Sequence, residues 1–232
     1  MVRRLFERAR HQRIELVLNA LDGDILRAHQ CLFAGGTAIA LRFGEYRESV
    51  DIDFLVSNID CYRNLRQLLT GKNDINAIVR HDAEPLVQER EIRADRDGIR
   101  TFINMDGLSI KFEIVSEGRV TFEPPTAEDV VCGISTLTQV DMVTSKLLAN
   151  TDRWRDEGVF SRDLIDLAMM TPSLTLLRTA VAKAETAYGA AILRDLERAI
   201  THIEDHREWL QRCMQVMAMA QPPAVVWKNI RA

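Results

Sequence analysis

The apolar and polar positions of this chain follow two patterns, which divide it into two halves. In the first half, short apolar runs and alternating segments are interspersed with stretches of helical spacing, where apolar residues recur every three or four positions. In the second half, helical spacing dominates. The helices expected in the first half cover residues 3–21, 24–30, 37–43 and 60–69. The strands expected there cover residues 31–34, 50–56, 75–79, 87–93, 98–104 and 109–115.

Turn signals separate these elements. Thr37 is expected to cap the helix that follows Gly35-Gly36, because a threonine hydroxyl can accept hydrogen bonds from the first amides of a helix. The pairs Asp97-Gly98 and Asp106-Gly107 lie between alternating segments and predict tight hairpin turns. Residues 75–115 are therefore expected to form an antiparallel meander that joins the earlier strands in one mixed sheet.

Two adjacent prolines mark the change to the second half. Pro124-Pro125 suits neither a helix nor a central strand, and so predicts a boundary between domains at residues 1–123 and 124–232. The helices expected after this boundary cover residues 137–150, 161–169, 174–187, 191–198 and 203–219. The sequence thus predicts an α/β (α+β) protein, in which helices flank a mixed β-sheet and a C-terminal helical bundle follows.

Composition and charge narrow the classes of function. The 232 residues are 47% hydrophobic and carry a net charge of −4, which argues against a chain that coats nucleic acid nonspecifically but allows a local basic patch. No stretch has the ~18 uninterrupted apolar residues of a membrane helix, and the N-terminal residues lack the apolar core of a signal peptide. The four cysteines are widely spaced and are expected to be reduced thiols in a cytoplasmic protein.

Two acidic residues within an apolar strand suggest chemistry. Asp51 and Asp53 are two positions apart, so their carboxylates are expected to project side by side and to repel each other unless a cation lies between them. Mg²⁺ is a suitable cation, because it takes oxygen ligands and keeps phosphate oxygens in its shell. Upstream, Gly35-Gly36 leads into a helix whose first amides can hold phosphate, and Thr37 can add a hydroxyl bond.

The order of these pieces resembles a known superfamily. A Gly-Gly turn, a helix and a strand with Asp-Ile-Asp are similar to the signature of DNA polymerase β-type nucleotidyltransferases. The segment GGTAIALRFGEYRESVDIDF more narrowly resembles the AbiEii/AbiGii nucleotidyltransferase toxins of bacterial type IV toxin–antitoxin systems, including Arg47 and Ser49 just before the acidic pair. Lys146, followed by the run SRDLIDLAMM with Asp163 and Asp166, resembles the downstream motif of that family.

The resemblance implies that the chain transfers a nucleoside monophosphate from an NTP to an acceptor. Asp51, Asp53 and Glu113 would be the metal-binding set for Mg²⁺ or Mn²⁺. The superfamily more often has Asp at the position of Glu113, so the longer Glu113 would ligate metal, serve as a base or do neither. Lys146 would offset phosphate charge, and Asp163 would complete the site from the helical domain, either by ligating metal or by positioning Lys146. The implied nucleotide-binding residues are Gly35, Gly36, Thr37, Ser49, Lys146 and Asp166.

Other charged residues have simpler interpretations. Arg47 is expected to bind phosphate or RNA, or else to be an ion-pair partner, with neither role favoured. The charged stretch EREIRADRDGIR, residues 89–100, is interpreted as an exposed hairpin rather than an RNA clamp. His202 and His206 are one helical turn apart, but no acidic or cysteine ligands accompany them, so a solvated helix face is favoured over a zinc site.

The first functional hypothesis is a bacterial, metal-dependent nucleotidyltransferase that acts as a toxin. By the family resemblance its acceptor would be RNA, with tRNA as the leading candidate, and a cognate antitoxin protein would be its partner. One alternative is a small-molecule nucleotidyltransferase, for example one that modifies an aminoglycoside. Another is a non-catalytic nucleotide-binding or interaction domain of the same fold, against which the intact motif residues count.

Overall fold

The computed structural model describes residues 5–71 and 74–232, which form two compact units. The first unit combines the chain up to Arg42 with Ser49–Thr138, and the second combines Phe43–Glu48 with Gln139–Ala232. Residues 3 and 4 of the expected first helix lie outside the described residues. Among the described residues, no helix combines the length and the apolar character needed to cross a membrane.

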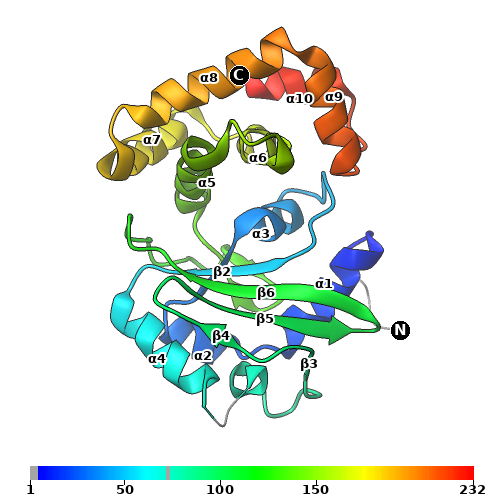
Figure 1. The fold of residues 1–232 in the computed structure, drawn as a ribbon, viewed down its shortest axis with the longest axis vertical. Helices are drawn as coiled ribbons and strands as arrows, with labels where there is room; N and C mark the ends of the chain where they lie inside the picture. The colour runs from blue at the N-terminus through cyan, green and yellow to red at the C-terminus, as the bar shows by residue number, and fades with distance from the viewer. Residues whose placement is uncertain (1–4, 72–73) are drawn as a thin grey trace. The chain divides into compact units, whose positions relative to one another are not determined.

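A mixed sheet forms the centre of the first unit, as the sequence predicts (Figure 1). Its strands follow the hydrogen-bonded order β1-β2-β6-β5-β3, and β4 also pairs with β5. The pair β2 and β6 is parallel, and the other described pairs of this sheet are antiparallel. The strands are β1 (Leu32–Ala34), β2 (Ile52–Val56), β3 (Val87–Gln88), β4 (Arg93–Ala94), β5 (Gly98–Met105) and β6 (Leu108–Ser116).

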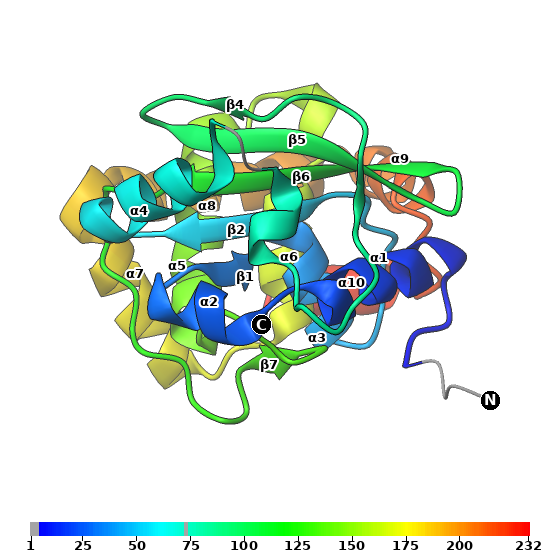
Figure 2. The same ribbon diagram turned by 90° about the horizontal axis from the view of Figure 1, so that it is seen from below.

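The two faces of this sheet differ in polarity. In β2, Ile52 and Phe54 are buried, whereas Asp53 between them is partly exposed on the opposite face. The same alternation runs through β6 and β5, so one face carries the apolar core. Figure 2 shows α1 (Ala9–Ala20), α2 (Gly23–Ala28) and α4 (Ile59–Leu69) in front of the sheet. The helix α3 (Gly35–Arg42) packs against β1 and β2 and lies behind the sheet in this view.

The chain between the prolines and the helical unit folds back onto the first unit. It forms a small sheet of β7 (Val130–Val131) and β8 (Ile134–Ser135). Arg42 at the end of α3 donates hydrogen bonds to Asp129, Thr136 and the Leu137 carbonyl oxygen over 2.9–3.0 Å. These bonds explain why residues 124–138, which follow the expected boundary at 123/124, belong to the first unit.

Several local predictions are wrong. Residues 75–79 do not form the expected strand, because Ile75–Ile78 form a 3₁₀ helix, η1. Thr37 does not cap α3, since that helix begins at Gly35 and Thr37 lies within its first turn. The strand expected over 87–93 is interrupted and yields the short strands β3 and β4. The turn expected at Asp106-Gly107 is confirmed: both residues have positive φ, 52° and 77°, as a two-residue hairpin requires.

The second unit is helical, as the sequence predicts. The helix α5 packs against α6, α7 and α8, and α10 packs against α6 and α9. The helix expected over 203–219 is divided, because α8 continues to Asp205 and α9 begins at Arg207. The helices are α5 (Gln139–Arg153), α6 (Arg162–Met170), α7 (Leu174–Tyr188), α8 (Ala191–Asp205), α9 (Arg207–Val216) and α10 (Pro223–Ile230), with a 3₁₀ turn, η2, at Glu157–Val159.

A buried carboxylate joins the segment Phe43–Glu48 to these helices. Asp166 on α6 is 0% exposed and accepts hydrogen bonds from Arg47 Nε at 2.7 Å, Arg47 Nη2 at 3.0 Å and the Tyr46 hydroxyl at 2.5 Å. Lys146 Nζ on α5 lies 2.7 Å from its other side. The backbone N–H of Glu48 also donates to the Met217 carbonyl oxygen. A short segment far from α6 in sequence is thus part of the helical unit.

A second carboxylate, that of Asp163, extends this ionic network. It accepts from Lys146 Nζ at 2.9 Å and from Arg153 Nε at 2.7 Å. Burial would raise the pKa of Asp163 and of Asp166, but the charges of Lys146, Arg153 and Arg47 outweigh it, so both pKa values lie below their ordinary range. Both acids are therefore ionised in the folded protein.

Because of this network, the stability of the helical unit is expected to fall at acidic pH. The unfolded carboxyl groups titrate near pH ~3.9, and their folded pKa values are lower, so the stabilisation is complete above that pH and is lost as the pH falls below about 4. Urea unfolding at a series of pH values, followed by the fluorescence of the three tryptophans, all in the second unit, will measure this loss. Asp166→Asn is expected to flatten the acid dependence and to cost about 3–5 kcal/mol at neutral pH, because it leaves buried cations uncompensated.

The matched control for this experiment is Glu197→Gln, which removes an exposed carboxylate from α8. It is expected to retain the acid dependence of the unsubstituted protein. Identical pH profiles for Asp166→Asn and the unsubstituted protein would show that the buried network does not govern this transition.

Candidate active site

The Gly-Gly turn and the acidic strand meet in the first unit. Asp53 on β2 pairs with Ala34 on β1, and its side chain packs directly on Gly35. A Cβ atom added to Gly35 would lie 2.5 Å from Asp53 Oδ2, and the φ of Gly35 is +69°, so any other residue would be both strained and in collision. Glycine at this position therefore allows a carboxylate to lie against the N-terminal turn of α3.

Asp51 is held to the same turn through its backbone. It lies one residue before β2 rather than within the expected strand. The Thr37 hydroxyl lies 2.5 Å from the Asp51 carbonyl oxygen, to which it donates, and 2.7 Å from the Ser49 hydroxyl. The Ser49 backbone N–H donates to His11 Nε2 at 3.0 Å. The two hydroxyls implied to bind nucleotide thus form internal hydrogen bonds, and Thr37 is 1% exposed.

Glu113 lies beside Asp53 but is bound by cations. The two residues are register partners on the parallel strands β6 and β2. The Glu113 carboxylate accepts hydrogen bonds from Arg100 and from Lys111. Burial would raise the pKa of Glu113, but these two bonds and charges outweigh it and lower the pKa below its ordinary value. The role of Glu113 as a third metal ligand remains a prediction.

The donor set at this turn suits a magnesium ion that also binds substrate. Within the described residues, no three acidic, cysteine or histidine side chains are arranged to hold a metal ion by themselves. Mg²⁺ is commonly bound by one or two carboxylates together with the phosphates of a nucleotide. Asp53 packs on Gly35, and Asp51 is bonded to Thr37 through its backbone carbonyl, so two carboxylates near this turn would have the chemistry for this second arrangement if substrate oxygens completed the shell.

The downstream motif residues lie in the helical unit, where the structure brings Lys146, Asp163 and Asp166 together. Lys146 is 5% exposed, and its ammonium lies between the two carboxylates. Of the two roles considered for Arg47, the ion pair is present, with Asp166. The sequence interpretation missed Arg153 and Tyr46 as partners of these acids. Arg153 carried a usable signal, because it lies two helical turns after Lys146 on α5.

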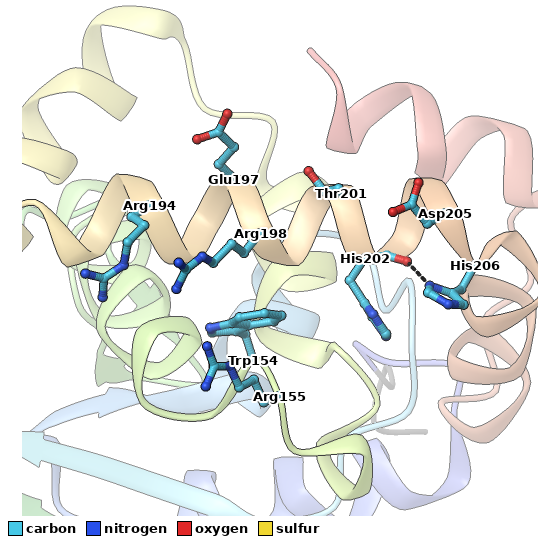
Figure 3. A pocket seen from close by; sticks show the side chains of 9 residues that line it. All are labelled: Trp154, Arg155, Arg194, Glu197, Arg198, Thr201, His202, Asp205 and His206. Carbon is cyan, nitrogen blue, oxygen red and sulfur yellow. Dashed lines mark hydrogen bonds between the residues drawn. The ribbon is translucent and has the colours of Figure 1, made fainter.

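The helical unit also contains an arginine-rich hollow of about 550 Å³, beside α8. Figure 3 shows Arg194, Arg198 and His202 on the side of α8 that faces Trp154, with Glu197 and Asp205 on its other side. Arg194 and Arg198 both form ion pairs with Asp195, so part of their charge is compensated within the helix. None of the residues implied in nucleotide transfer lines this hollow.

Comparisons with solved structures agree with the fold. A Helicobacter pylori protein described as a candidate nucleotidyltransferase has the same fold, with a TM-score of 0.55 and 15% identity over 97% of this chain and 95% of its own. A second structure, JHP933 from Helicobacter pylori, gives a TM-score of 0.53 and 15% identity over 96% and 89%. At these identities the likeness concerns the fold alone. The comparison with curated proteins gives no match.

The family comparison extends from fold to activity. The family described as nucleotidyl transferase AbiEii toxin, type IV TA system, matches residues 18–228, which include the Gly-Gly turn, Asp51, Asp53 and the Lys146 network. This range covers both units and confirms the family predicted from the motifs. The chain is therefore a nucleotidyltransferase and belongs to the AbiEii toxin family of type IV toxin–antitoxin systems.

Proposed function

We propose that this enzyme transfers a nucleoside monophosphate from an NTP to RNA, with tRNA as the first candidate, in a reaction that requires Mg²⁺. The observation that carries the proposal is the packing of Asp53 against Gly35. It puts a carboxylate beside backbone amides at the start of α3, and such amides bind phosphate. A nucleotide triphosphate and its metal ion would both find ligands at this turn.

Each residue of the turn has a separate task in this proposal. Gly35 and Gly36 let the triphosphate approach the backbone, and Asp51 and Asp53 hold the metal ion. When bound, Mg²⁺ would stabilise charge on the phosphates and lower the pKa of the attacking hydroxyl. Thr37 fixes the Asp51 backbone to α3, so the metal ligand and the phosphate-binding turn keep their spacing. The acceptor hydroxyl loses its proton to solvent, and its oxygen forms a bond to the α-phosphorus. The bond between that phosphorus and the α–β bridging oxygen breaks, and pyrophosphate leaves.

The helical unit is proposed to contribute Lys146 to the same reaction. Its ammonium has three N–H bonds, of which two are directed to Asp163 and Asp166. Arg153 also pairs with Asp163, and Arg47 also pairs with Asp166. Asp163 therefore positions Lys146, but the charge of Lys146 is not the only one that compensates these two carboxylates. We assign to it the task of offsetting phosphate charge, and to Asp166 an indirect role in nucleotide binding through Lys146.

The family supports a proposal for the biological setting. As a member of a toxin family, the enzyme is proposed to act in the bacterial cytoplasm, where a cognate antitoxin protein opposes it. Growth arrest on expression, relieved by loss of catalytic carboxylates or by the antitoxin, would agree with this setting.

Labelling with each α-labelled NTP, Mg²⁺ and total RNA tests the activity. Label is expected in RNA with the unsubstituted enzyme and to be absent with Asp51→Asn/Asp53→Asn, because the metal-binding oxygens are lost. The matched control is Asp106→Asn, which removes a carboxylate from the hairpin, where asparagine tolerates the same positive φ. Label in an aminoglycoside panel but not in RNA would favour the small-molecule alternative, and equal labelling by the double variant would reject this site.

A paired glycine substitution tests the packing of Asp53 on the turn. Gly35→Ala and Gly107→Ala both place alanine at a positive φ, +69° and +77°, but only the first meets a neighbouring side chain. Because the strain is similar and the collision differs, Gly35→Ala is expected to lower the transfer rate about 100-fold, and Gly107→Ala to leave it unchanged per folded molecule. Equal rates for the two variants would show that the contact with Asp53 is dispensable.

A lysine pair tests the contribution of the helical unit. Lys146→Met is expected to lower the transfer rate about 100-fold, since it removes a cation proposed to stabilise phosphate charge. Lys183→Met is the matched control, because Lys183 forms an ion pair with the buried Asp141 in the same unit. The control should lower stability without lowering the rate per folded molecule, and a similar loss of rate in both variants would assign Lys146 to structure alone.

A further inference from the structure

A basic hollow lies near the β4 edge of the first unit. It encloses about 490 Å³ and draws on β4, β5, β6 and the residues just before β4. Four of its eight lining residues are cations, although the whole chain carries a net charge of −4. The lining residues are Arg90, Glu91, Ile92, Arg93, Arg100, Thr101, Phe102 and Lys111. None of them belongs to the Gly-Gly turn or to the acidic pair.

This hollow is aligned with Asp53 across the sheet. Asp53 is paired with Glu113, Glu113 with Arg100, and Arg100 with Arg93. Side chains of paired residues on neighbouring strands lie on the same face, so these four form one row. The row crosses three strand spacings, which is about 14 Å. It begins at the proposed metal ligand and ends at the arginines of the hollow.

An aromatic ring lies beside this row. Phe102 is paired with Lys111 and is partly exposed, whereas Ile103 next to it in β5 is buried on the other face. The Arg90 guanidinium lies over the Phe102 ring, 4.2 Å from its centroid. A flat ring and a planar guanidinium on a basic surface are groups on which nucleic-acid bases stack.

The charges of the hollow are only partly compensated. Glu113 divides its two oxygens between Arg100 in the row and Lys111 beside it, and Arg100 also pairs with Asp95. Among the described residues, neither Arg90 nor Arg93 forms a salt bridge. Phosphate binding by these two arginines would therefore break no existing ion pair, which lowers its cost.

We propose that this hollow binds the RNA acceptor strand, with phosphate on Arg90 and Arg93 and a base against Phe102. The inference rests on the proposed function, because it assumes that the acceptor is RNA. An acidic protein partner would form ion pairs with the cations, but its carboxylates would not stack on the exposed Phe102 ring. At the ~3.4 Å rise of a stacked strand, the row spans about four nucleotides. The hollow would thus contact the acceptor about four nucleotides from the attacking hydroxyl.

Binding of fluorescent RNA to the catalytically inactive Asp53→Asn protein tests the hollow separately from catalysis. Adding Arg90→Ala/Arg93→Ala is expected to weaken RNA binding about tenfold and to reduce the salt dependence by about two phosphate contacts. Phe102→Leu, which keeps an apolar side chain in the strand, is expected to weaken binding about tenfold through lost stacking. The charge-matched control, Arg194→Ala/Arg198→Ala in the hollow of Figure 3, should leave RNA affinity unchanged.

Acceptor length gives a second test in the active enzyme. Labelling of RNA oligonucleotides should rise steeply once they exceed about four nucleotides, and Arg90→Ala/Arg93→Ala should abolish this rise while the KM for NTP stays the same. Three outcomes would each overturn the proposal. They are unchanged RNA affinity in the Arg90→Ala/Arg93→Ala variant, an equal loss of RNA affinity in the Arg194→Ala/Arg198→Ala control, and binding of polyglutamate as tightly as RNA. RNA bound through the hollow but never labelled would refute the proposed function and leave the binding site standing.

Discussion

The buried carboxylate of Asp166 is the constraint on which the helical unit depends. A fully buried anion is tolerated only where cations and hydrogen-bond donors surround it, and here Arg47, Lys146 and Tyr46 do so. Two of these come from Phe43–Glu48, so the chain must leave the first unit after α3 and return to it before β2. The path of the chain just before the acidic motif is therefore determined by the chemistry of α6, although the two segments are more than 100 residues apart.

The first unit accommodates the acidic residue of β2 beside a glycine. Asp53 occupies an otherwise apolar strand because it lies on the face that α3 covers, where Gly35 leaves room for its carboxylate. The neighbouring Glu113 is compensated by the side chains of Arg100 and Lys111. Asp53 lies at a turn suited to phosphate and metal, and Glu113 organises the cations beside it.

The sequence correctly predicts features that depend on nearby residues. Its predictions fail where a contact with a residue distant in sequence determines the local structure. The family, the mixed sheet and the turn at Asp106-Gly107 follow from motifs and spacing within short windows. The strand expected at 75–79 fails because the Asn76 side chain is bonded to the backbone of Leu86, which favours the 3₁₀ turn. Thr37 is of a residue type that commonly caps helices, but its hydroxyl donates instead to the carbonyl oxygen of Asp51, fourteen residues away.

The charged stretch 89–100 shows most directly what register adds to sequence. The hairpin itself is confirmed, since Arg93 pairs with Arg100 across the β4–β5 turn. The RNA contact proposed for Arg90 and Arg93 departs from the interpretation of this stretch as a hairpin rather than an RNA clamp. The sequence does not reveal that β6 brings Lys111 to the same face, because a shift of one residue would turn every side chain to the opposite face. The net charge of the whole chain also has little effect on the electrostatic potential at this face. Salt screens charges beyond about 8–10 Å, so acids elsewhere on the protein add little to the partial compensation that Glu113 and Asp95 give the cations of this hollow.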